Sequence, residues 1–371
     1  MRELLSELRD WHTAGTPFAL ATVVAVRGSA PRAPGALMAV SATGAVAGSV
    51  SGGCVESDVY EVATETLTTG RTELRTYGIS DDEAFGTGLT CGGTIEVLVR
   101  PFVTAADRDG LRELVDTVAT GEPVALATVV SGAARPGARR VVLADRVSGS
   151  LGDEGLDAAV TDDARGLLAQ GATGSVRYGA HGERRMQDVT VFVQAYAPAP
   201  RMLVFGAIDH AAATAGIGSF LGYRVTVCDA RPAFATRERF PTADEVVCAW
   251  PHTYLESTPV DARTVVCVLT HDPKFDVPLL AAALRTPAAY IGVMGSRRTH
   301  ADRTARLREA GVDEAALARL ASPVGLDLGA RTPEETAVSI AAEIIQHRWG
   351  GTGRPLGELA GAIHHGPPAG P

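Results

Sequence analysis

The chain has 371 residues, of which 46% are apolar and 21% are charged, and its formal net charge is −9. This length allows two or three cooperative domains, and the acidic balance argues against nucleic acid as a main partner. No apolar run has the length of a membrane span, and the first ten residues have the pattern of an amphipathic helix, not of a secretion signal. We therefore expect a cytoplasmic globular protein with no membrane span.

An internal repeat organises the N-terminal half. The segment Pro17–Val24 recurs as Pro123–Val130, and each copy follows an amphipathic helical pattern. Later matches occur in the same order: Gly48-Ser49 with Gly149-Ser150, the segment 70–78 with 171–179, and the strand patterns Thr94–Val99 with Val189–Val193. Each copy predicts the order helix, strand, strand, helix, strand, strand. We therefore expect an internally duplicated α+β domain, with residues 1–104 as the first repeat and residues 105–197 as a degenerate second repeat.

The two repeats differ in their polar motifs, which are confined to the first. Cys54 is predicted to open a helix that ends near Thr69, and a helix N-terminus stabilises the thiolate, the nucleophilic and metal-ligating form of cysteine. Glu56 is either a polar partner of this thiol or a carboxylate that favours the helix start. Cys91 lies between glycine-rich segments, where small neighbours expose the sulfur. The loop that begins at Arg27 and ends at Arg32 is a candidate anion cradle.

The cysteines indicate neither a disulfide framework nor a zinc site, because the five of them form no closely spaced pair. Cys228, Cys248 and Cys267 lie in apolar strand patterns, which predicts small buried side chains. Cys54 and Cys91 lie in polar loops, which favours sulfur or soft-metal chemistry over acid–base hydrolysis.

The C-terminal half predicts a Rossmann-like, doubly wound α/β domain over residues 201–350, followed by a loose tail over residues 351–371. A short proline-containing linker, residues 196–200, precedes it. Short apolar strands then alternate with helical patterns, which is typical of parallel strands joined by right-handed crossovers. The predicted strands are Met202–Phe205, Arg224–Asp229, Glu245–Ala249, Thr264–Leu269 and Ala289–Val293, and the predicted helices are Ala211–Leu221, Val277–Leu284, Arg303–Ala310 and a last one from the N-cap Thr332 to about Trp349.

The first turn of this domain is close to a dinucleotide-binding fingerprint. Gly206 would make the tight turn, and Asp229 could hold a ribose hydroxyl. Ile208 stands where a second glycine would let a pyrophosphate approach the backbone, so the fold is indicated more strongly than the cofactor.

Further candidate ligand-binding residues follow the later strands, because ligands of open parallel sheets bind beyond the carboxyl ends of the strands. The Gly-Ser-Arg-Arg turn suits a phosphate through its backbone N–H groups and its two guanidinium groups. The candidates are His271, Asp272, Gly295, Ser296, Arg297, Arg298 and Asp327.

These motifs resemble the XdhC/CoxI family of accessory proteins for xanthine dehydrogenase and aerobic carbon monoxide dehydrogenase. The resemblance covers nearly the whole chain and is carried by Gly53-Cys-Val-Glu56, Cys91-Gly-Gly93, Leu269-Thr-His-Asp272, Tyr290 through Arg298, and Leu326 through Glu335. The sequence departs from the family pattern, Gly-Ala-Gly-His, at the first turn of the C-terminal domain. Ile208 and Asp209 stand there in place of the glycine and the histidine.

The resemblance implies a protein that binds the molybdenum cofactor, protects it, assists its sulfuration and inserts it into a molybdenum hydroxylase apoenzyme. It also implies a homodimer and a cysteine desulfurase as a further partner. On this interpretation Cys54 and Cys91 contact the molybdenum or relay sulfur, while Arg297 and Arg298 hold phosphate. The C-terminal domain would then supply one part of the site and the first repeat the sulfur.

Two other interpretations remain open at the level of sequence. One is an NAD(P)-dependent oxidoreductase, which needs tight nicotinamide binding despite Ile208. The other is a docking protein for the hydroxylase, in which the cysteines are dispensable. We expect an insertion factor more than a turnover enzyme.

Overall fold

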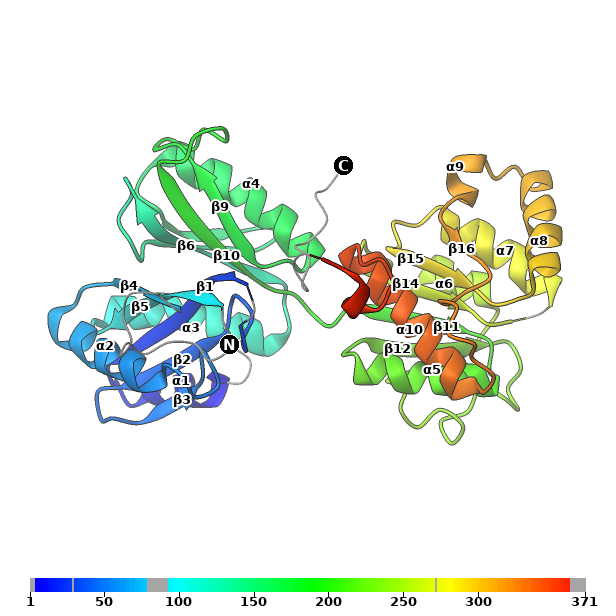
Figure 1. Cartoon of the computed structure of the whole chain (residues 1–371), viewed down its shortest axis with the longest axis horizontal. Helices are drawn as coiled ribbons and strands as arrows, with labels where there is room; N and C mark the ends of the chain where they lie inside the picture. The colour runs from blue at the N-terminus through cyan, green and yellow to red at the C-terminus, as the bar shows by residue number, and fades with distance from the viewer. Residues whose placement is uncertain (1–3, 29, 79–92, 271, 361–371) are drawn as a thin grey trace. The chain divides into compact units, whose positions relative to one another are not determined.

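The computed structural model describes residues 4–28, 30–78, 93–270 and 272–360. The chain divides into two compact units, residues 1–198 and residues 199–371 (Figure 1). None of the described helices is long and apolar enough to cross a membrane.

The N-terminal unit contains two sheets with the same topology. The first has the strand order β3-β2-β1-β5-β4 and the second the order β8-β7-β6-β10-β9, with all paired strands antiparallel. This match confirms the predicted α+β architecture of two similar halves. The first repeat comprises α1 (Leu5–Thr13), β1 (Phe18–Arg27), β2 (Leu37–Ser41), β3 (Val46–Gly48), α2 (Glu56–Thr69), β4 (Glu73–Tyr77) and β5 (Thr94–Phe102). The second comprises α3 (Ala105–Thr120), β6 (Val124–Gly132), β7 (Arg139–Val142), β8 (Val147–Ser150), α4 (Glu154–Gln170), β9 (Gly174–Tyr178) and β10 (Val189–Tyr196).

Each sheet of this unit is covered on both faces. Helices α2 and α4 cover one face of their own sheets, over cores rich in valine and alanine. On the other faces, α1 and α3 share one core with strands of both repeats, in which Leu8, Phe18, Leu114 and Leu126 are buried. Val24 and Phe192 belong to a small direct contact between the repeats. The duplicated halves therefore form one folding unit.

The C-terminal unit is the predicted doubly wound parallel sheet, with the strand order β13-β12-β11-β14-β15-β16. Its strands are β11 (Arg201–Phe205), β12 (Arg224–Asp229), β13 (Glu245–Cys248), β14 (Val265–Val268), β15 (Tyr290–Val293) and β16 (Leu320–Ala321). Its helices are α5 (Asp209–Phe220), α6 (Pro251–Ser257), α7 (Pro273–Leu284), α8 (Arg297–Glu309), α9 (Glu314–Leu317) and α10 (Pro333–Trp349). Helix α10 begins with the predicted capping box, in which Thr332 accepts from the N–H of Glu335.

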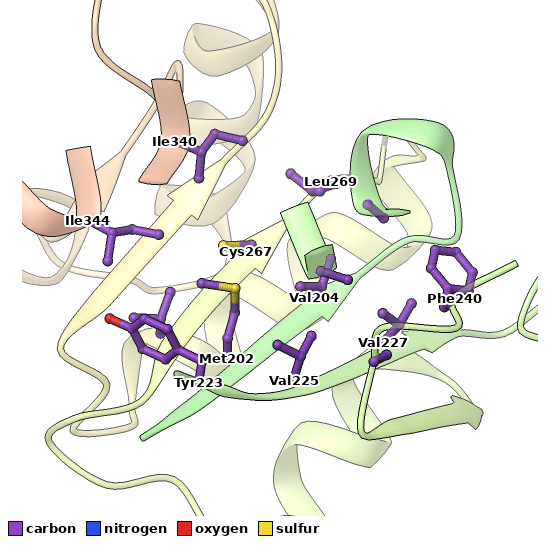
Figure 2. Close-up of a cluster of buried hydrophobic side chains, with 14 of the residues drawn as sticks. Met202, Val204, Tyr223, Val225, Val227, Phe240, Cys267, Leu269, Ile340 and Ile344 are labelled. Atoms are coloured by element: carbon purple, nitrogen blue, oxygen red, sulfur yellow. The ribbon is translucent and has the colours of Figure 1, made fainter. Parts of the chain in front are cut away.

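Both faces of this sheet carry a hydrophobic core. On one face, α5 and α10 pack on Met202, Val204 and Val225, with Ile340 and Ile344 contributed by α10 (Figure 2). On the other, α6 to α9 pack on residues such as Phe205 and Val266. The strands are therefore buried on both faces, which explains their nearly continuous apolar sequences.

The structure adds details that the sequence patterns did not predict. Each repeat contains a third short strand, β3 or β8, between the predicted hairpin and helix. Cys228 and Cys267 are buried as expected, but the prediction for Cys248 was wrong, because this residue is exposed at the end of β13. Strand β13 lies at the edge of the sheet, where no neighbouring strand covers its outer side.

The repeat predicts matched costs for two glycine substitutions. Gly48 and Gly149 have φ values of +78° and +77°, and a Cβ would lie 2.3 Å from the carbonyl oxygen of Leu37 and 2.4 Å from that of Arg139, respectively. The backbone cannot move away without a large cost in free energy, so Gly48→Ala and Gly149→Ala should each lower the free energy of unfolding by about 3 kcal/mol. Urea denaturation of the full chain measures this cost.

Gly15→Ala is the control for this pair, because Gly15 has a φ of +67° with open space around it. Its cost should be about 1 kcal/mol, from backbone conformation alone. Equal costs at all three positions would contradict the role assigned to the close backbone approach.

Candidate functional site

A cavity of about 430 Å³ lies at the carboxyl edge of the parallel sheet. Loops that follow β11, β12 and β14 form it, together with the start of α6. Its lining residues include Gly206, Ile208, Asp229, Arg231, Thr270, Asp272, Lys274 and Phe275. Three of the predicted ligand-binding residues, Gly206, Asp229 and Asp272, are thus brought together. Strands β12 and β14 lie on opposite sides of β11, so the cavity occupies the place where doubly wound sheets bind ligands.

The first turn is tight and lacks room for an added side chain. Gly206 has a φ of +108°, and a Cβ there would lie 3.0 Å from the Thr270 side chain. Ile208 is the N-cap of α5, packs against the hydrophobic core and also lines the cavity. The backbone of this turn is therefore partly covered by an apolar side chain, which does not favour a pyrophosphate there.

Asp229 is buried and its carboxylate is fully hydrogen-bonded. One oxygen accepts from the N–H of Ala207 at 2.7 Å and from Arg231 Nη2 at 2.8 Å, and the other from the N–H and Nε of Arg231, both at 2.9 Å. Burial alone would raise the pKa of Asp229, but these donors, Arg231 foremost, hold it below its usual value. A ribose hydroxyl would have to displace Arg231 to reach this carboxylate. Together with Ile208, this weighs against a standard nicotinamide dinucleotide site.

Sequence reasoning missed an aromatic and cationic group beside the cavity. Lys274 Nζ lies 3.2 Å from Asp272 and 4.7 Å from the ring centre of Phe275, and that ring lies 5.1 Å from Trp250, whose side chain is half exposed. Arg231 lies similarly over the Phe234 ring. Trp250 lies two residues after the end of β13, so an inspection of the residues after that strand would have found it.

The Gly295–Arg298 turn follows β15, and its residues are not among those that line the 430 Å³ cavity. Ser296 is the N-cap of α8 and accepts from the N–H of Thr299 at 3.1 Å. Arg297 and Arg298 are exposed on the first turn of this helix, and no ion pair joins either of them to another described residue. Asp327 is exposed in the connection between β16 and α10 and does not line the cavity.

A buried ion pair supports this turn from below. Arg303 Nη2 lies 2.8 Å from Asp276 and 3.2 Å from the carbonyl oxygen of Met294, and both charged side chains are 4% exposed. Thr270 donates to the other oxygen of Asp276. Arg303 Nη1 is buried without a hydrogen-bond partner among the described residues, and it lies 3.5 Å from where a Cβ on Gly295 would stand. A buried N–H donor with no hydrogen-bond partner among the described residues therefore lies beside the turn.

In the first repeat, Glu56 organises the loop that carries Cys54. Its carboxylate accepts from the Ser49 and Ser51 hydroxyls at 2.5 Å each and from four backbone N–H groups, those of Ser51, Gly52, Gly53 and Val55, at 2.8–3.2 Å. Burial would raise the pKa of Glu56, but the Ser49 and Ser51 contacts lower it to about 2. The group is ionised at neutral pH and holds no proton to transfer, so its role here is to position the loop.

Cys54 is half-buried two residues before α2, and its N–H donates to Ser51 Oγ at 3.0 Å. Arg27 is mostly exposed and pairs with Glu96 at 3.4 Å, and Arg32 is exposed in the loop after β1. Cys91 and His271, both predicted from sequence, lie outside the described residues. In the parts that the structure describes, no group of three His, Cys, Asp or Glu side chains is arranged to hold a metal ion.

The fold and site define a two-part protein, in which a duplicated α+β unit with a cysteine loop precedes a Rossmann-type unit with a crevice at the carboxyl edge of its sheet. Comparison with family models identifies it further: "XdhC and CoxI family" matches residues 11–78 and 117–179, and "XdhC Rossmann domain" matches residues 202–344. The chain belongs to the XdhC and CoxI family.

Individual relatives match over most of their length. A Bacillus subtilis protein, named as a probable subunit of xanthine dehydrogenase, is 32% identical and covers 89% of this chain and 92% of that protein. An Escherichia coli protein named "Molybdenum cofactor insertion chaperone PaoD" is 28% identical and covers 90% and 85%. A crystal structure from Bacillus halodurans, described as a xanthine dehydrogenase, superposes with a TM-score of 0.65 at 27% identity, over 92% of this chain and 95% of that one.

The Glu56 network predicts a pH-dependent contribution to stability. Because the folded-state pKa, about 2, lies below the usual glutamate value of 4.5, the stabilisation is complete above about pH 5 and is lost as the pH falls toward 2. Glu56→Gln should cost about 1.5–3 kcal/mol at pH 7. The difference from wild type in urea unfolding should shrink between pH 5 and pH 3; a difference that stays constant would rule out an ionised Glu56.

The buried ion pair predicts a second stability effect. Asp276→Asn leaves the Arg303 charge buried without its counter-ion and should cost about 3–5 kcal/mol. Adding Arg303→Met should recover part of that loss. Glu256→Gln, which removes an exposed pair with Arg285 at 3.3 Å, should cost less than about 1 kcal/mol. Similar urea midpoints for the Asp276 and Glu256 variants would refute the assignment.

Proposed function

We propose that this chain binds the molybdenum cofactor as cargo, protects it and delivers it to a molybdenum hydroxylase of the xanthine dehydrogenase or aerobic carbon monoxide dehydrogenase type. The observation that carries the proposal is the match to the relative named as a molybdenum cofactor insertion chaperone, which extends over both units. The name of the Bacillus subtilis relative supports the same class of target.

The crevice of the C-terminal unit is suited to a planar cargo. Molybdopterin joins a pterin ring system to a dithiolene and a phosphate. The Phe275 ring borders the cavity and contacts Trp250, and aromatic faces stack on planar heterocycles. Lys274 and Arg231 also line the cavity, and each forms an ion pair with an aspartate of the same cavity, at 3.2 Å and 2.8 Å, so the charges of these four side chains balance. A cavity of about 430 Å³ is within the range of small-molecule sites.

The α8 turn supports a phosphate-binding role for Gly295–Arg298. A helix N-terminus attracts anions through its N–H groups and dipole, and two exposed guanidinium groups stand on its first turn. The unpartnered Nη1 of Arg303 lies beneath the same turn. In this proposal Arg297 and Arg298 hold the phosphate, and Arg303 positions the turn.

The cysteine loop supplies the sulfur chemistry of the proposal. A thiolate is a good ligand for a soft metal centre and a good acceptor of sulfur. If a cysteine desulfurase is the donor, the Cys54 thiolate attacks the outer sulfur of the donor persulfide, a new S–S bond forms, and the donor cysteine leaves as a thiolate. Glu56 holds the loop for this attack. Cys91 acts with Cys54, and the homodimer is the acting form.

Expression in a host that makes the molybdenum cofactor tests the proposal. The purified wild-type chain should carry molybdenum and pterin, measured by elemental analysis and by fluorescence of the oxidised pterin. Arg297→Gln with Arg298→Gln should lower the loading at least tenfold, because each bidentate contact to phosphate contributes about 1–3 kcal/mol. Cys54→Ser with Cys91→Ser should lower molybdenum retention or sulfuration of the target hydroxylase.

Two controls match these variants. Arg224→Gln removes an exposed guanidinium at the start of β12, at the opposite edge of the sheet, and Cys248→Ser removes an exposed thiol outside the cysteine motifs. Both should load as wild type does. If the wild-type chain carries no pterin and the cysteine variants still activate the hydroxylase, a docking role without cofactor replaces this proposal.

A further inference from the structure

A second cavity, of about 580 Å³, lies in the N-terminal unit between the two repeats. We call it the arginine cavity. The end of α2, the end of β5 with the start of α3, and the loop between β6 and β7 border it. Its charged lining residues are Arg100, Arg135, Arg139 and Asp107. The opposite dipoles of the α2 C-terminus and the α3 N-terminus largely offset each other, so the side chains decide the charge of the site.

The three guanidinium groups face a single carboxylate. Arg100 donates from Nη2 to Asp107 at 2.7 Å and from Nε to the carbonyl oxygen of Gly137 at 3.0 Å, while its Nη1 is buried with no hydrogen-bond partner in the described parts of the chain. Arg139 donates from Nη2 to the backbone oxygen of Asp107 at 3.4 Å. Both guanidinium groups lie over the Phe102 ring, at 4.4 Å and 4.6 Å. The cavity therefore holds two positive charges in excess.

Arg100 and Arg139 are partly buried and Arg135 is exposed, so the first two lose part of their hydration without a full set of counter-ions. Burial, and then the neighbouring Arg100, lower the pKa of Arg139 to about 9. The group is therefore still charged at neutral pH, although its surroundings disfavour the charge. Burial likewise lowers the pKa of Arg100, against the effect of Asp107. An arrangement of this kind is stabilised by an anion that accepts hydrogen bonds from both groups.

Because the unit is duplicated, the residues around the arginine cavity can be compared with their equivalents in the other repeat. Thr22 pairs with Leu37 in the first repeat, and its equivalent Thr128 pairs with Arg139 in the second, so Leu37 and Arg139 occupy matching places. In the same way Leu20 pairs with Arg100, and its equivalent Leu126 pairs with Gln194, so Arg100 and Gln194 also occupy matching places.

The two repeats contact each other at two equivalent places, which we call joints. The same hydrogen bond forms at both, but its donor is a neutral amide at one joint and a charged guanidinium group at the other. Gln194 Nε2 donates to the carbonyl oxygen of Gly35 at 3.3 Å, as Arg100 Nε does to that of Gly137. The repeats can thus be joined with a neutral amide. A guanidinium group is therefore not required for this hydrogen bond, and the extra positive charge on one side favours an anionic ligand there.

We propose that the arginine cavity binds the phosphate group of a small phosphorylated molecule. The guanidinium groups of Arg100, Arg139 and Arg135, which line the cavity, form the hydrogen bonds, and the volume accommodates an organic part as well as a phosphate. This site is in the N-terminal unit and does not depend on the crevice of the C-terminal unit. The source of the phosphate is either a free metabolite or the molybdenum cofactor itself.

Titration calorimetry of the cofactor-free full chain with inorganic pyrophosphate tests the site. Arg100→Gln and Arg139→Leu each introduce the residue that the other joint already carries, so the variants should fold. Each should weaken pyrophosphate binding at least tenfold. Arg112→Gln, which removes a mostly exposed guanidinium of α3, should change it less than twofold. Without ligand, Arg139→Leu should leave the Tm unchanged or raise it, since a partly buried charge with no ion pair to a carboxylate is removed.

The outcomes separate this site from the proposed function. Absence of pyrophosphate binding by the wild-type chain at millimolar concentration overturns the inference, as does equal affinity in the variants. A fall in Tm with unchanged affinity assigns the arginines to holding the repeats together, which also overturns it. If cofactor loading falls in Arg100→Gln and Arg139→Leu, the phosphate is that of the molybdenum cofactor. If loading is unchanged while pyrophosphate binding is lost, the ligand is a free phosphorylated metabolite.

Discussion

The loops around both candidate sites depend on one kind of interaction, a carboxylate that accepts hydrogen bonds from a turn or from a side chain that supports it. Glu56 holds the cysteine loop, Asp229 holds the first turn of the Rossmann-type unit, and Asp276 supports the turn before α8 through Arg303. In the second repeat Asp157 accepts from the N–H of Leu151 at 2.7 Å, as Glu56 does from the loop of the first. Loops rich in glycine lose much conformational entropy on ordering. A multiply bonded carboxylate offsets this cost, because its hydrogen bonds are charge-assisted.

These interactions also distinguish residues that hold the loops in place from residues that can contact a ligand. Glu56 and Asp229 have chemically versatile side chains, yet all their capacity is committed to the fold. The groups with capacity to spare are cations: Arg297 and Arg298 at the α8 turn, and Arg100 and Arg139 between the repeats. The molecule is acidic overall, so these local clusters of positive charge oppose its net charge. They are consistent with anionic ligands at defined places, and not with a general attraction for polyanions.

Much of the architecture could be predicted from sequence, because it rests on local periodicity. Duplicated strand patterns around Pro17 and Pro123 predicted two similar halves, and alternating apolar runs after Pro200 predicted the parallel sheet. The candidate site was harder to predict from sequence than the fold. Asp229 lies at the crevice, but the ion pair by which Arg231 occupies its carboxylate depends on side-chain geometry that the spacing of residues does not reveal. The arginine cavity was missed because it is formed by segments from both repeats, which are distant in sequence. Cys248 was taken as buried because an apolar run does not distinguish a central strand from an edge strand.

The shared core between the repeats has a consequence for the origin of the chain. A protein with one repeat would expose the sheet face that carries Val24 and Leu98 together with one side of α1, and a second copy would be the natural cover for it. Fusion of two such copies into one gene makes the symmetric partner permanent. Selection can then act on each half separately, so that one joint keeps a neutral glutamine while its twin acquires arginines. Two identical chains in a symmetric dimer must carry the same residues, so a difference between the two contacts can arise only after fusion.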